Sequence, residues 1–338
     1  MARHTLLPQP LRHDAFRVSH GADLSVSEKR MRGPDLERPF HGVRQPAGGG
    51  HDVVARCRAY ATRMRPSEVF SHTTAASLWG VPLPSSVEAD TRLHVSAVGG
   101  GQRPRGRGVV GHEFQGAGMS AVDRDGLRVV DPVTCWLQLA TMLSFDDLVA
   151  AGDHLVLTPR QQGRGSPRPF TTLDALAARL EVSRQRGARP ARQALGAVRD
   201  GAESRQETRL RLALIRHGLP EPALNVPILG PDGEFVAFGD LVYPEFAVLV
   251  EYDGEQHRTS SRQYYRDVER GEALIGAGWI VIRETKETPR TGSRATVARA
   301  ERALLTRGWR PNVDHPSQTA RNTAAIGGLR RLGGEERV

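Results

Sequence analysis

The sequence predicts an α+β or α/β protein with two folded domains between flexible tails. The predicted domains are a C-terminal mixed sheet flanked by helices and a smaller N-terminal α+β domain. Three observations support this prediction. The 338 residues exceed the length of most single domains. Between residues 203 and 312 the apolar period indicates a helix, three strands, a helix, a strand and a helix. Residues 1–50 and 313–338 are rich in Arg, Pro, Gly and Ser without a sustained period, which predicts disordered tails.

The charge balance favours a phosphate-rich partner. The formal net charge is +9, and lysine occurs only at Lys29 and Lys286, so nearly all of the positive charge is arginine. Guanidinium groups match phosphate geometry, and binding gains from the release of counterions. A GC-rich genome also replaces lysine by arginine, so composition alone raises the expectation of nucleic-acid binding only modestly.

Cysteine usage and hydropathy predict a reduced, cytoplasmic protein that does not enter a membrane. Cys57 and Cys135 are the only cysteines, with no CxxC pair, and the N-terminus is polar rather than signal-like. No apolar run approaches the roughly 20 residues that a spanning helix needs. The twelve histidines are scattered along the chain, so the sequence does not predict a structural zinc site.

Residues 51–157 predict the N-terminal domain. A helix begins near residue 51 and ends before Pro66, and Ser71 or Thr73 caps a second, short helix that stops at Gly80. The segments RLHVSAV and VVGHEF alternate as strands around the basic loop GGGQRPRGRG, which predicts a β-hairpin with an arginine-bearing tip. A strand and two helices follow, the first helix starting at Asp131 and Pro132 and the second capped by Ser144. Residues 158–202 are predicted to be a linker and a helix.

Two paired strands of the C-terminal domain bring acidic residues together. A tight turn at residues 243–246 makes FGDLVYP and EFAVLVEYD an antiparallel hairpin, which sets Asp240 nearly opposite Glu251. Glu251 and Asp253 are two apart on one strand and share a face. Three carboxylates are therefore expected to converge at one edge of the sheet.

Like charges placed side by side are unfavourable unless a cation lies between them. A hard divalent ion bound by oxygen atoms is the usual solution, and Mg²⁺ takes one or two carboxylates together with water and phosphate oxygens. Mn²⁺ suits the same ligands. On a basic chain, such a site predicts metal-assisted hydrolysis of a phosphodiester bond.

Residues 203–310 resemble the DUF559 domains of the PD-(D/E)xK nuclease superfamily, which are similar to very-short-patch-repair endonucleases. The resemblance implies a restriction-endonuclease-like fold, with Asp240 and Glu251 as metal ligands. It also implies that Glu207 is an outer ligand or positions water, and that His257 is a general acid or base. The residues that carry it are Ser204, Glu207, Asp240, Pro244, Glu251, Tyr252, Asp253, Gly254, His257, Arg266, Asp267, Arg270 and the strand WIVIRET.

The sequence departs from the superfamily pattern at one position. A lysine usually follows the glutamate by two residues, and here that position is Asp253, as in DUF559 domains. Lys286 follows the next strand and is a candidate to approach the metal site in its place. If neither Lys286 nor His257 reaches the scissile phosphate, catalysis has lost a participant.

Several of these residues also have purely structural explanations. Glu207 is the third residue of a helix whose N-cap is Ser204, so a capping box explains it equally well. Asp253 precedes a glycine, which is ordinary turn chemistry. Arg262, Arg266 and Arg270 are four apart, which predicts either a stripe that contacts DNA phosphates or a solvated helix face.

Residues 51–157 resemble the antitoxin-type domain of the AbiEi family. The segments SHTTAASLWGVPLP, VVGHEF and GLRVVDPVTCWLQLA carry this resemblance. It implies a winged-helix-like unit that either binds DNA, with Arg103, Arg105 and Arg107 as the wing, or serves as a packing module. It also implies either a toxin partner or a homodimer.

Together these features predict a metal-dependent DNA endonuclease that uses Mg²⁺ or Mn²⁺. The alternative is a non-catalytic DNA-binding or antitoxin-like regulator that retains a nuclease fold. A third function, RNA processing, stays open because phosphate chemistry does not distinguish the sugars without a reader of the 2′-hydroxyl group.

Overall fold

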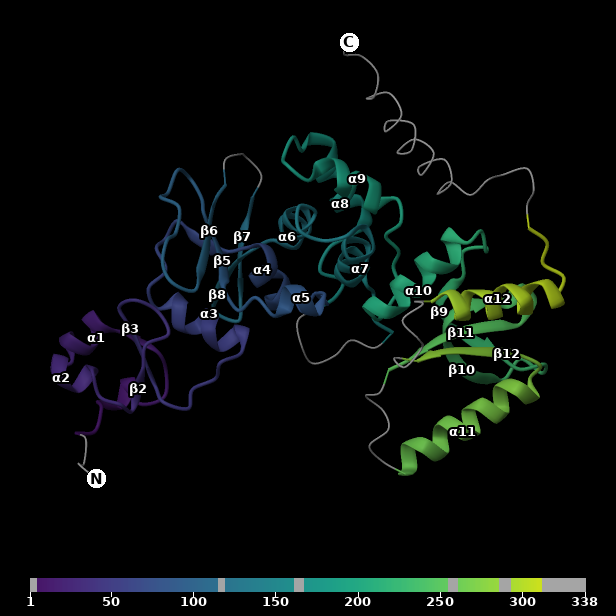
Figure 1. The fold of residues 1–338 in the computed structure, drawn as a ribbon, viewed down its shortest axis with the longest axis horizontal. Helices are drawn as coiled ribbons and strands as arrows, with labels where there is room; N and C mark the ends of the chain where they lie inside the picture. Colours follow the sequence, from purple (N-terminus) through teal and green to yellow (C-terminus); the bar gives the residue numbers. More distant parts are fainter. Residues whose placement is uncertain (1–4, 115–118, 161–166, 255–260, 286–292, 312–338) are drawn as a thin grey trace, which may run out of the picture. The chain divides into compact units, whose positions relative to one another are not determined.

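The computed structural model describes residues 5–114, 119–160, 167–254, 261–285 and 293–311. The chain forms two compact units, shown in Figure 1. Unit 1 comprises residues 1–156 and 169–198, and unit 2 comprises residues 157–168 and 199–338. The predicted linker is therefore divided, because residues 169–198 pack with unit 1.

Residues 5–46 are ordered elements, so the expectation of a disordered N-terminal tail was wrong for this segment. Its apolar residues lack a regular period, yet they meet in one buried cluster of Leu7, Leu11, Phe16, Val26, Met31 and Leu36. Very short elements bring them together, with a three-stranded sheet in the order β1-β3-β2. The elements are η1 (Gln9–Leu11), β1 (Phe16–Arg17), α1 (Val18–Asp23), α2 (Glu28–Met31), β2 (Leu36–Glu37) and β3 (Val43–Pro46).

A mixed five-stranded sheet in the order β6-β5-β4-β8-β7 forms the centre of unit 1. Helix α4 packs against β5, and α3 contacts both β5 and β8. The strands are β4 (Glu68–Phe70), β5 (Leu93–Ala97), β6 (Val109–Glu113), β7 (Ala121–Arg124) and β8 (Leu127–Val130). The helices of this part are α3 (Val53–Ala61), α4 (His72–Leu78) and α5 (Ser85–Glu88).

The predicted hairpin between β5 and β6 was wrong, because the two strands are parallel. Leu93 pairs with Val109, so the arginine-bearing loop runs back along the sheet before β6 begins. The loop follows the edge strand closely, since Arg103 Nε donates a hydrogen bond of 2.7 Å to the carbonyl oxygen of Gly111. A loop of eleven residues is long enough for this return, whereas a hairpin needs only two to five.

Four helices complete unit 1, and two of them begin where the sequence predicts. Asp131 Oδ1 accepts a hydrogen bond of 2.9 Å from the Thr134 backbone N–H, and Ser144 Oγ accepts one of 3.3 Å from Asp147. Trp136 is completely buried, and its Nε1 donates to the Leu148 carbonyl oxygen at 2.9 Å. The helices are α6 (Pro132–Leu139), α7 (Phe145–Val156), α8 (Leu173–Val182) and α9 (Ala188–Leu195).

Unit 2 confirms the predicted order of one helix, three strands, a helix, a strand and a helix. Its mixed sheet has the order β12-β11-β10-β9, with β11 and β12 parallel and the other pairs antiparallel. The helices are α10 (Arg205–Arg216), α11 (Ser261–Gly276) and α12 (Arg294–Thr306). The strands are β9 (Ala223–Leu229), β10 (Phe235–Tyr243), β11 (Val248–Asp253) and β12 (Ile280–Thr285), and η2 (Pro244–Phe246) forms the predicted turn.

Helices cover both faces of this sheet (Figure 1). Leu210 of α10 and Leu304 of α12 belong to one buried cluster with Val250 of β11. On the opposite face Leu274 of α11 belongs to a second cluster with Leu249. The alternation of Leu249 and Val250 between two cores explains why this strand reads as a continuous apolar run. Among the helices that the structure describes, none is long and apolar enough to cross a membrane.

Close packing around Gly152 of α7 makes a testable prediction about unit 1. A Cβ atom at this position would lie 2.6 Å from Val198 Cγ2 and 3.1 Å from Trp136 Nε1. We expect Gly152→Ala to lower the free energy of unfolding by about 1–3 kcal/mol, because valine is stiff and overpacking outweighs the better helix propensity of alanine. Denaturant unfolding followed by circular dichroism measures the change.

Gly196 is the matched control, because it ends α9 with right-handed backbone angles and a Cβ there would meet nothing closer than 3.7 Å. Gly196→Ala should leave stability unchanged or raise it by less than about 1 kcal/mol. Equal destabilisation by both substitutions would contradict the packing that the structure shows.

Candidate functional site

Glu207 lies in the first turn of α10, and its side chain both caps this helix and belongs to the group of acidic residues predicted from the sequence. Ser204 Oγ accepts a hydrogen bond of 3.1 Å from the Glu207 backbone N–H. The Glu207 carboxylate in turn accepts from the Glu203 backbone N–H at 2.9 Å and from Asn225 Nδ2 at 3.1 Å. The side chain is buried, and this burial raises the pKa of Glu207. Glu207 therefore caps the helix and also places a carboxylate inside the unit.

Asp240 lies at a break in the regular alternation of β10. A Cβ atom on Gly239 would lie 2.6 Å from Leu249 Cδ1 and 2.7 Å from Val242 Cγ2, although residues three apart point to opposite faces of a regular strand. On the neighbouring strand, Asn225 has a left-handed backbone with φ of 47°. Such irregularities redirect side chains and are frequent beside active sites.

The surroundings of Asp240 favour its protonated form. Burial, together with the nearby carboxylates of Glu207 and Glu251, raises the pKa of Asp240 to about 7. The Tyr252 backbone N–H, which donates to Asp240 Oδ2 at 3.1 Å, and the charge of Arg270 act in the opposite direction. Three carboxylates from α10, β10 and β11 thus interact, as expected for Asp240 and Glu251, with Glu207 as the third.

Glu251 is buried and is neutralised by two arginines. Arg270 of α11 contacts both oxygens of the Glu251 carboxylate, with Nη1 at 3.2 Å from Oε2, and it also donates to the Phe238 carbonyl oxygen at 2.7 Å. Arg283 Nε lies 3.5 Å from Glu251 Oε2. Leu241 pairs with Val250, and Asp240 Oδ2 accepts a hydrogen bond from the Tyr252 backbone N–H, so Asp240 lies beside the end of β11 that carries Glu251.

Arg283 is the residue of this site that the sequence analysis missed. It is directly paired with Glu251 in the parallel register of β11 and β12. A signal was present, because Arg283 is a charged residue inside the apolar strand WIVIRET. The number of residues between the two strands does not reveal that they are adjacent and parallel, so the partner of Arg283 could not be identified.

The other predicted site residues lie in several places. Asp253 is at the end of β11 and half-buried. His257 and Lys286 lie outside the described residues, and the side chains of Arg262 and Arg266 are likewise outside them. Arg270 contacts Glu251 rather than standing free for DNA. In unit 1, the side chains of Arg103, Arg105 and Arg107 are exposed on the loop before β6.

The carboxylates do not form a ready-made three-ligand metal site in the described part of the chain. No three acidic side chains there offer ligand oxygens that all lie within 4.8 Å of one another. The two guanidinium groups on Glu251 explain part of this, since they compete with any cation for its oxygens. The predicted convergence of Asp240, Glu251 and Asp253 is therefore only partial.

Comparison with known proteins gives relatives without an assigned activity. Two Mycobacterium tuberculosis proteins are similar to this chain: uncharacterized protein MT2308 of strain CDC 1551 and uncharacterized protein Rv2248 of strain H37Rv. Each is 29% identical over 265 residues, which cover 75% of this chain and 86% of the relative. No family model matches the chain. No solved structure matches it either.

The raised pKa of Asp240 predicts how one substitution changes stability with pH. An acid whose pKa rises on folding binds its proton more tightly in the folded state, so stability falls as the pH rises from about 4 through about 7. Asp240→Asn removes this loss and keeps an acceptor for Tyr252. We expect it to raise the free energy of unfolding by on the order of 2 kcal/mol at pH 8.5 and much less at pH 5.5.

Denaturant unfolding at the two pH values tests this difference. Asp232→Asn is the matched control, because Asp232 is exposed in the turn between β9 and β10. The control should change stability by less than about 0.5 kcal/mol at either pH. A loss of stability in Asp240→Asn at pH 8.5 would show that Asp240 is held as a paired anion.

Proposed function

We propose that unit 2 is a metal-dependent DNA endonuclease domain of the PD-(D/E)xK type that resembles the DUF559 domains. The observation that carries the proposal is the proximity of Glu207 and Glu251 to Asp240, whose pKa is raised by its burial and by these two carboxylates. Natural proteins rarely bury three carboxylates near one another unless a function requires it. The order of the strands and the helix that precedes them are compatible with the restriction-endonuclease-like fold.

The carboxylate oxygens of Asp240 and Glu251 are of the ligand type that a hard divalent cation prefers. Asp240 and Glu251 would hold Mg²⁺ or Mn²⁺ through carboxylate oxygens, and Glu207 would orient a water molecule from the side of α10. When bound, the ion supplies Lewis acidity and lowers the pKa of a coordinated water. Because the pKa of Asp240 is raised to about 7, protons compete with the ion for its oxygens, and the proton must leave before they can bind the ion.

Two arginines stand near the position where the superfamily carries a lysine. Asp253 occupies the lysine position itself, whereas Arg270 and Arg283 contact Glu251 from α11 and β12. A guanidinium group does not lose its proton in proteins, so neither arginine acts as a base. Their role in the proposed reaction is to stabilise negative charge on the phosphate, which requires them to leave Glu251 when the cation binds.

A specific observation favours a second candidate, a non-catalytic DNA-binding or antitoxin-like regulator. The pairs of Arg270 and Arg283 with Glu251 satisfy that carboxylate without a cation. The exposed arginines at 103, 105 and 107 in unit 1 would still contact phosphates in such a protein. This candidate needs a basic surface, whereas the nuclease needs the carboxylates of unit 2.

Nicking of supercoiled plasmid in Mg²⁺ or Mn²⁺ distinguishes the two candidates. We expect the wild-type protein to nick the plasmid, and Asp240→Asn and Glu251→Gln each to lower the rate at least about 100-fold, because metal chemistry contributes several kcal/mol. Asp232→Asn and Glu245→Gln are controls of the same chemical type, since both residues are exposed in turns of the same sheet. They should nick at the wild-type rate.

Two outcomes would contradict the proposed nuclease function. Equal nicking by all variants would mean that Asp240 and Glu251 are not the site. Retardation of DNA without nicking by any variant, weakening steeply as salt increases, would establish the regulator instead. A single-stranded RNA of the same sequence, assayed in parallel, shows which nucleic acid the site accepts.

A further inference from the structure

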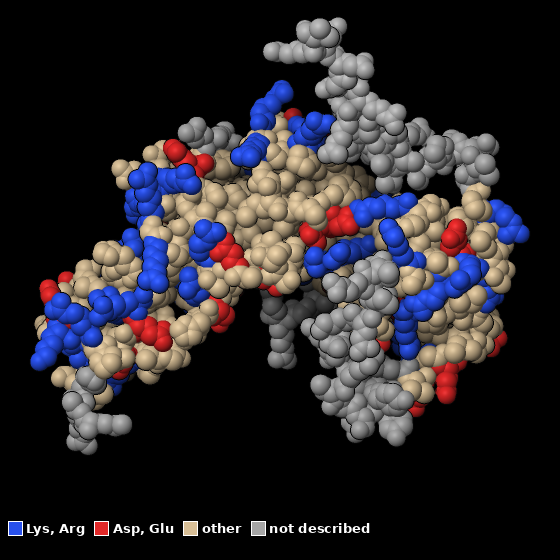
Figure 2. All heavy atoms as spheres, viewed as in Figure 1, with Lys and Arg blue, Asp and Glu red and all other residues tan. Residues whose placement is uncertain are grey.

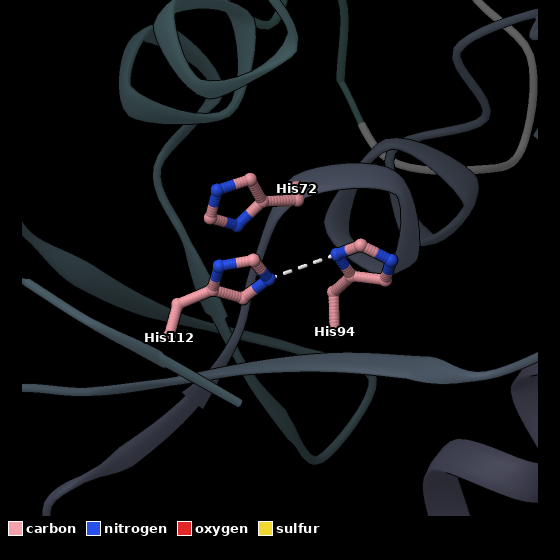
Figure 3. A group of neighbouring side chains, drawn as sticks. All are labelled: His72, His94 and His112. Atoms are coloured by element: carbon pink, nitrogen blue, oxygen red, sulfur yellow. Dashed lines mark hydrogen bonds between the residues drawn. The ribbon is translucent and has the colours of Figure 1, made fainter. Parts of the chain in front are cut away.

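Three histidines that are far apart in the sequence lie together in unit 1 (Figure 3). His94 is on β5 and His112 on β6, while His72 begins α4. The parallel register pairs His94 with Val110 and Ser96 with His112, so His94 and His112 share one face of the sheet. Helix α4 packs against β5 on this face, and Ser96 Oγ donates to Ser71 Oγ at 2.8 Å beside His72.

The three rings are close enough to share one ion. His94 Nδ1 lies 2.9 Å from His112 Nε2, and the His72 ring stacks on His112 with centroids 3.7 Å apart (Figure 3). One ligand nitrogen from each histidine lies within 4.8 Å of the other two. In a tetrahedral zinc site with bonds of 2.0–2.1 Å, ligand nitrogens are about 3.3 Å apart. The distance of 2.9 Å between His94 Nδ1 and His112 Nε2 is shorter than this value, so these two nitrogens would move apart to bind one ion.

The local chemistry keeps the imidazoles neutral, which metal binding requires. Burial and, to a smaller extent, the neighbouring histidines lower the pKa of His72 to about 3 and that of His112 to about 4. Burial also lowers the pKa of His94. A hydrogen bond between two neutral imidazoles uses one N–H and one lone pair, so this cluster keeps lone pairs available at neutral pH.

Neighbouring side chains fix the backbone of two of the histidines. His72 has a left-handed backbone with φ of 52°, which is strained for a residue other than glycine. Gln138 Oε1 of α6 accepts a hydrogen bond of 2.8 Å from the His72 backbone N–H and holds this conformation. The His94 backbone N–H donates to Thr74 Oγ1 at 2.8 Å. Gln138 and Thr74 thus hold the backbone of these two histidines in place.

The cluster borders a cavity of about 680 Å³. His72 and His112 line it together with Gln138, while Arg103 and Arg186 contribute positive charge and Glu113 contributes one negative charge. Three protein ligands and access to a cavity are the features of zinc sites that keep an open coordination position. The two arginines favour an anion as the group that would enter that position.

We propose that His72, His94 and His112 bind one transition-metal ion, with Zn²⁺ as the best match for three imidazoles, and leave a position for a small anionic ligand from the cavity. In the described part of the chain, this is the one group of three or more potential ligands with donor atoms within 4.8 Å of one another. The site is independent of the carboxylates of unit 2. Imidazole ligands distinguish it from the oxygen-only site proposed there.

Calorimetric titration of chelator-treated protein with Zn²⁺ tests the metal site. We expect one equivalent to bind to the wild-type chain, and His112→Gln and His72→Asn each to weaken binding at least about 100-fold. Asparagine is chosen at position 72 because it tolerates the left-handed backbone. Thermal unfolding without metal establishes that both variants fold, and added Zn²⁺ should raise the melting temperature of the wild-type protein alone.

Two controls separate this site from the rest of the chain. His51→Gln removes an exposed histidine of unit 1, and Asp240→Asn with Glu251→Gln removes the carboxylates of unit 2. Both should keep the full equivalent of bound Zn²⁺. If folded His72→Asn and His112→Gln bind Zn²⁺ as the wild type does, or the wild type binds none, the proposed site does not exist.

The open position is tested with Co²⁺ in place of Zn²⁺ and inorganic phosphate as the probe. Phosphate should change the visible absorption of the Co²⁺-loaded wild type, and Arg103→Gln should weaken that response without lowering the metal content. A spectrum that phosphate leaves unchanged would refute the open position and leave a closed metal site.

Discussion

Strand register is the constraint on which both candidate sites depend. Successive side chains on a strand point to opposite faces, so a shift of one residue would move every polar side chain to the wrong side. In unit 2, the pairing of Leu241 with Val250 brings Asp240 beside Glu251. In unit 1, the pairing of Ser96 with His112 brings His112 beside His94. The apolar residues of the same strands hold each register, because they would lose their cores if it slipped.

The two units handle buried polar groups by different physical means. In unit 2 arginines from α11 and β12 pair with the carboxylate of Glu251, whereas burial and the neighbouring carboxylates raise the pKa of Asp240. In unit 1 the histidines are kept neutral by burial, so they need no counter-charge. The carboxylate site of unit 2 is suited to a hard cation, which would take the place of the arginine charges beside Glu251. The histidine site of unit 1 is suited to a borderline metal that is bound by neutral nitrogen atoms.

The sequence predicts local structure in this protein better than it predicts pairing between distant segments. Caps at Asp131 and Ser204 and the turn before β11 depend on residues close in sequence, and the structure confirms them. The parallel pairing of β5 and β6 depends on a loop that runs back along the sheet, which no local pattern encodes. For the same reason the sequence did not reveal the pairing of Arg283 with Glu251 or the cluster of three histidines, since only long-range packing places these residues beside their partners.

The N-terminal 46 residues show why a prediction of disorder from composition was wrong. Their Arg, Pro and Gly content is typical of disorder, yet six apolar residues spaced without period form a buried cluster. Arg30 also contributes to this segment's structure, because its guanidinium group pairs with Asp35 at 2.7 Å and is itself largely buried. The apolar residues of this small core are spaced too irregularly along the sequence to be recognised as a helix or strand pattern.

Arginine content is an ambiguous guide to nucleic-acid binding in this chain because many arginines are used within the fold. Arg211 is fully buried and donates to Glu221 at 3.0 Å, and Arg160 forms two hydrogen bonds of 2.9 Å with Glu203. On the face shown in Figure 2, basic and acidic side chains are interspersed in both units. The net charge of +9 still attracts a polyanion at long range. Specific contacts, however, must come from arginines without an internal acidic partner, so a count of arginines overestimates the surface that can bind phosphate.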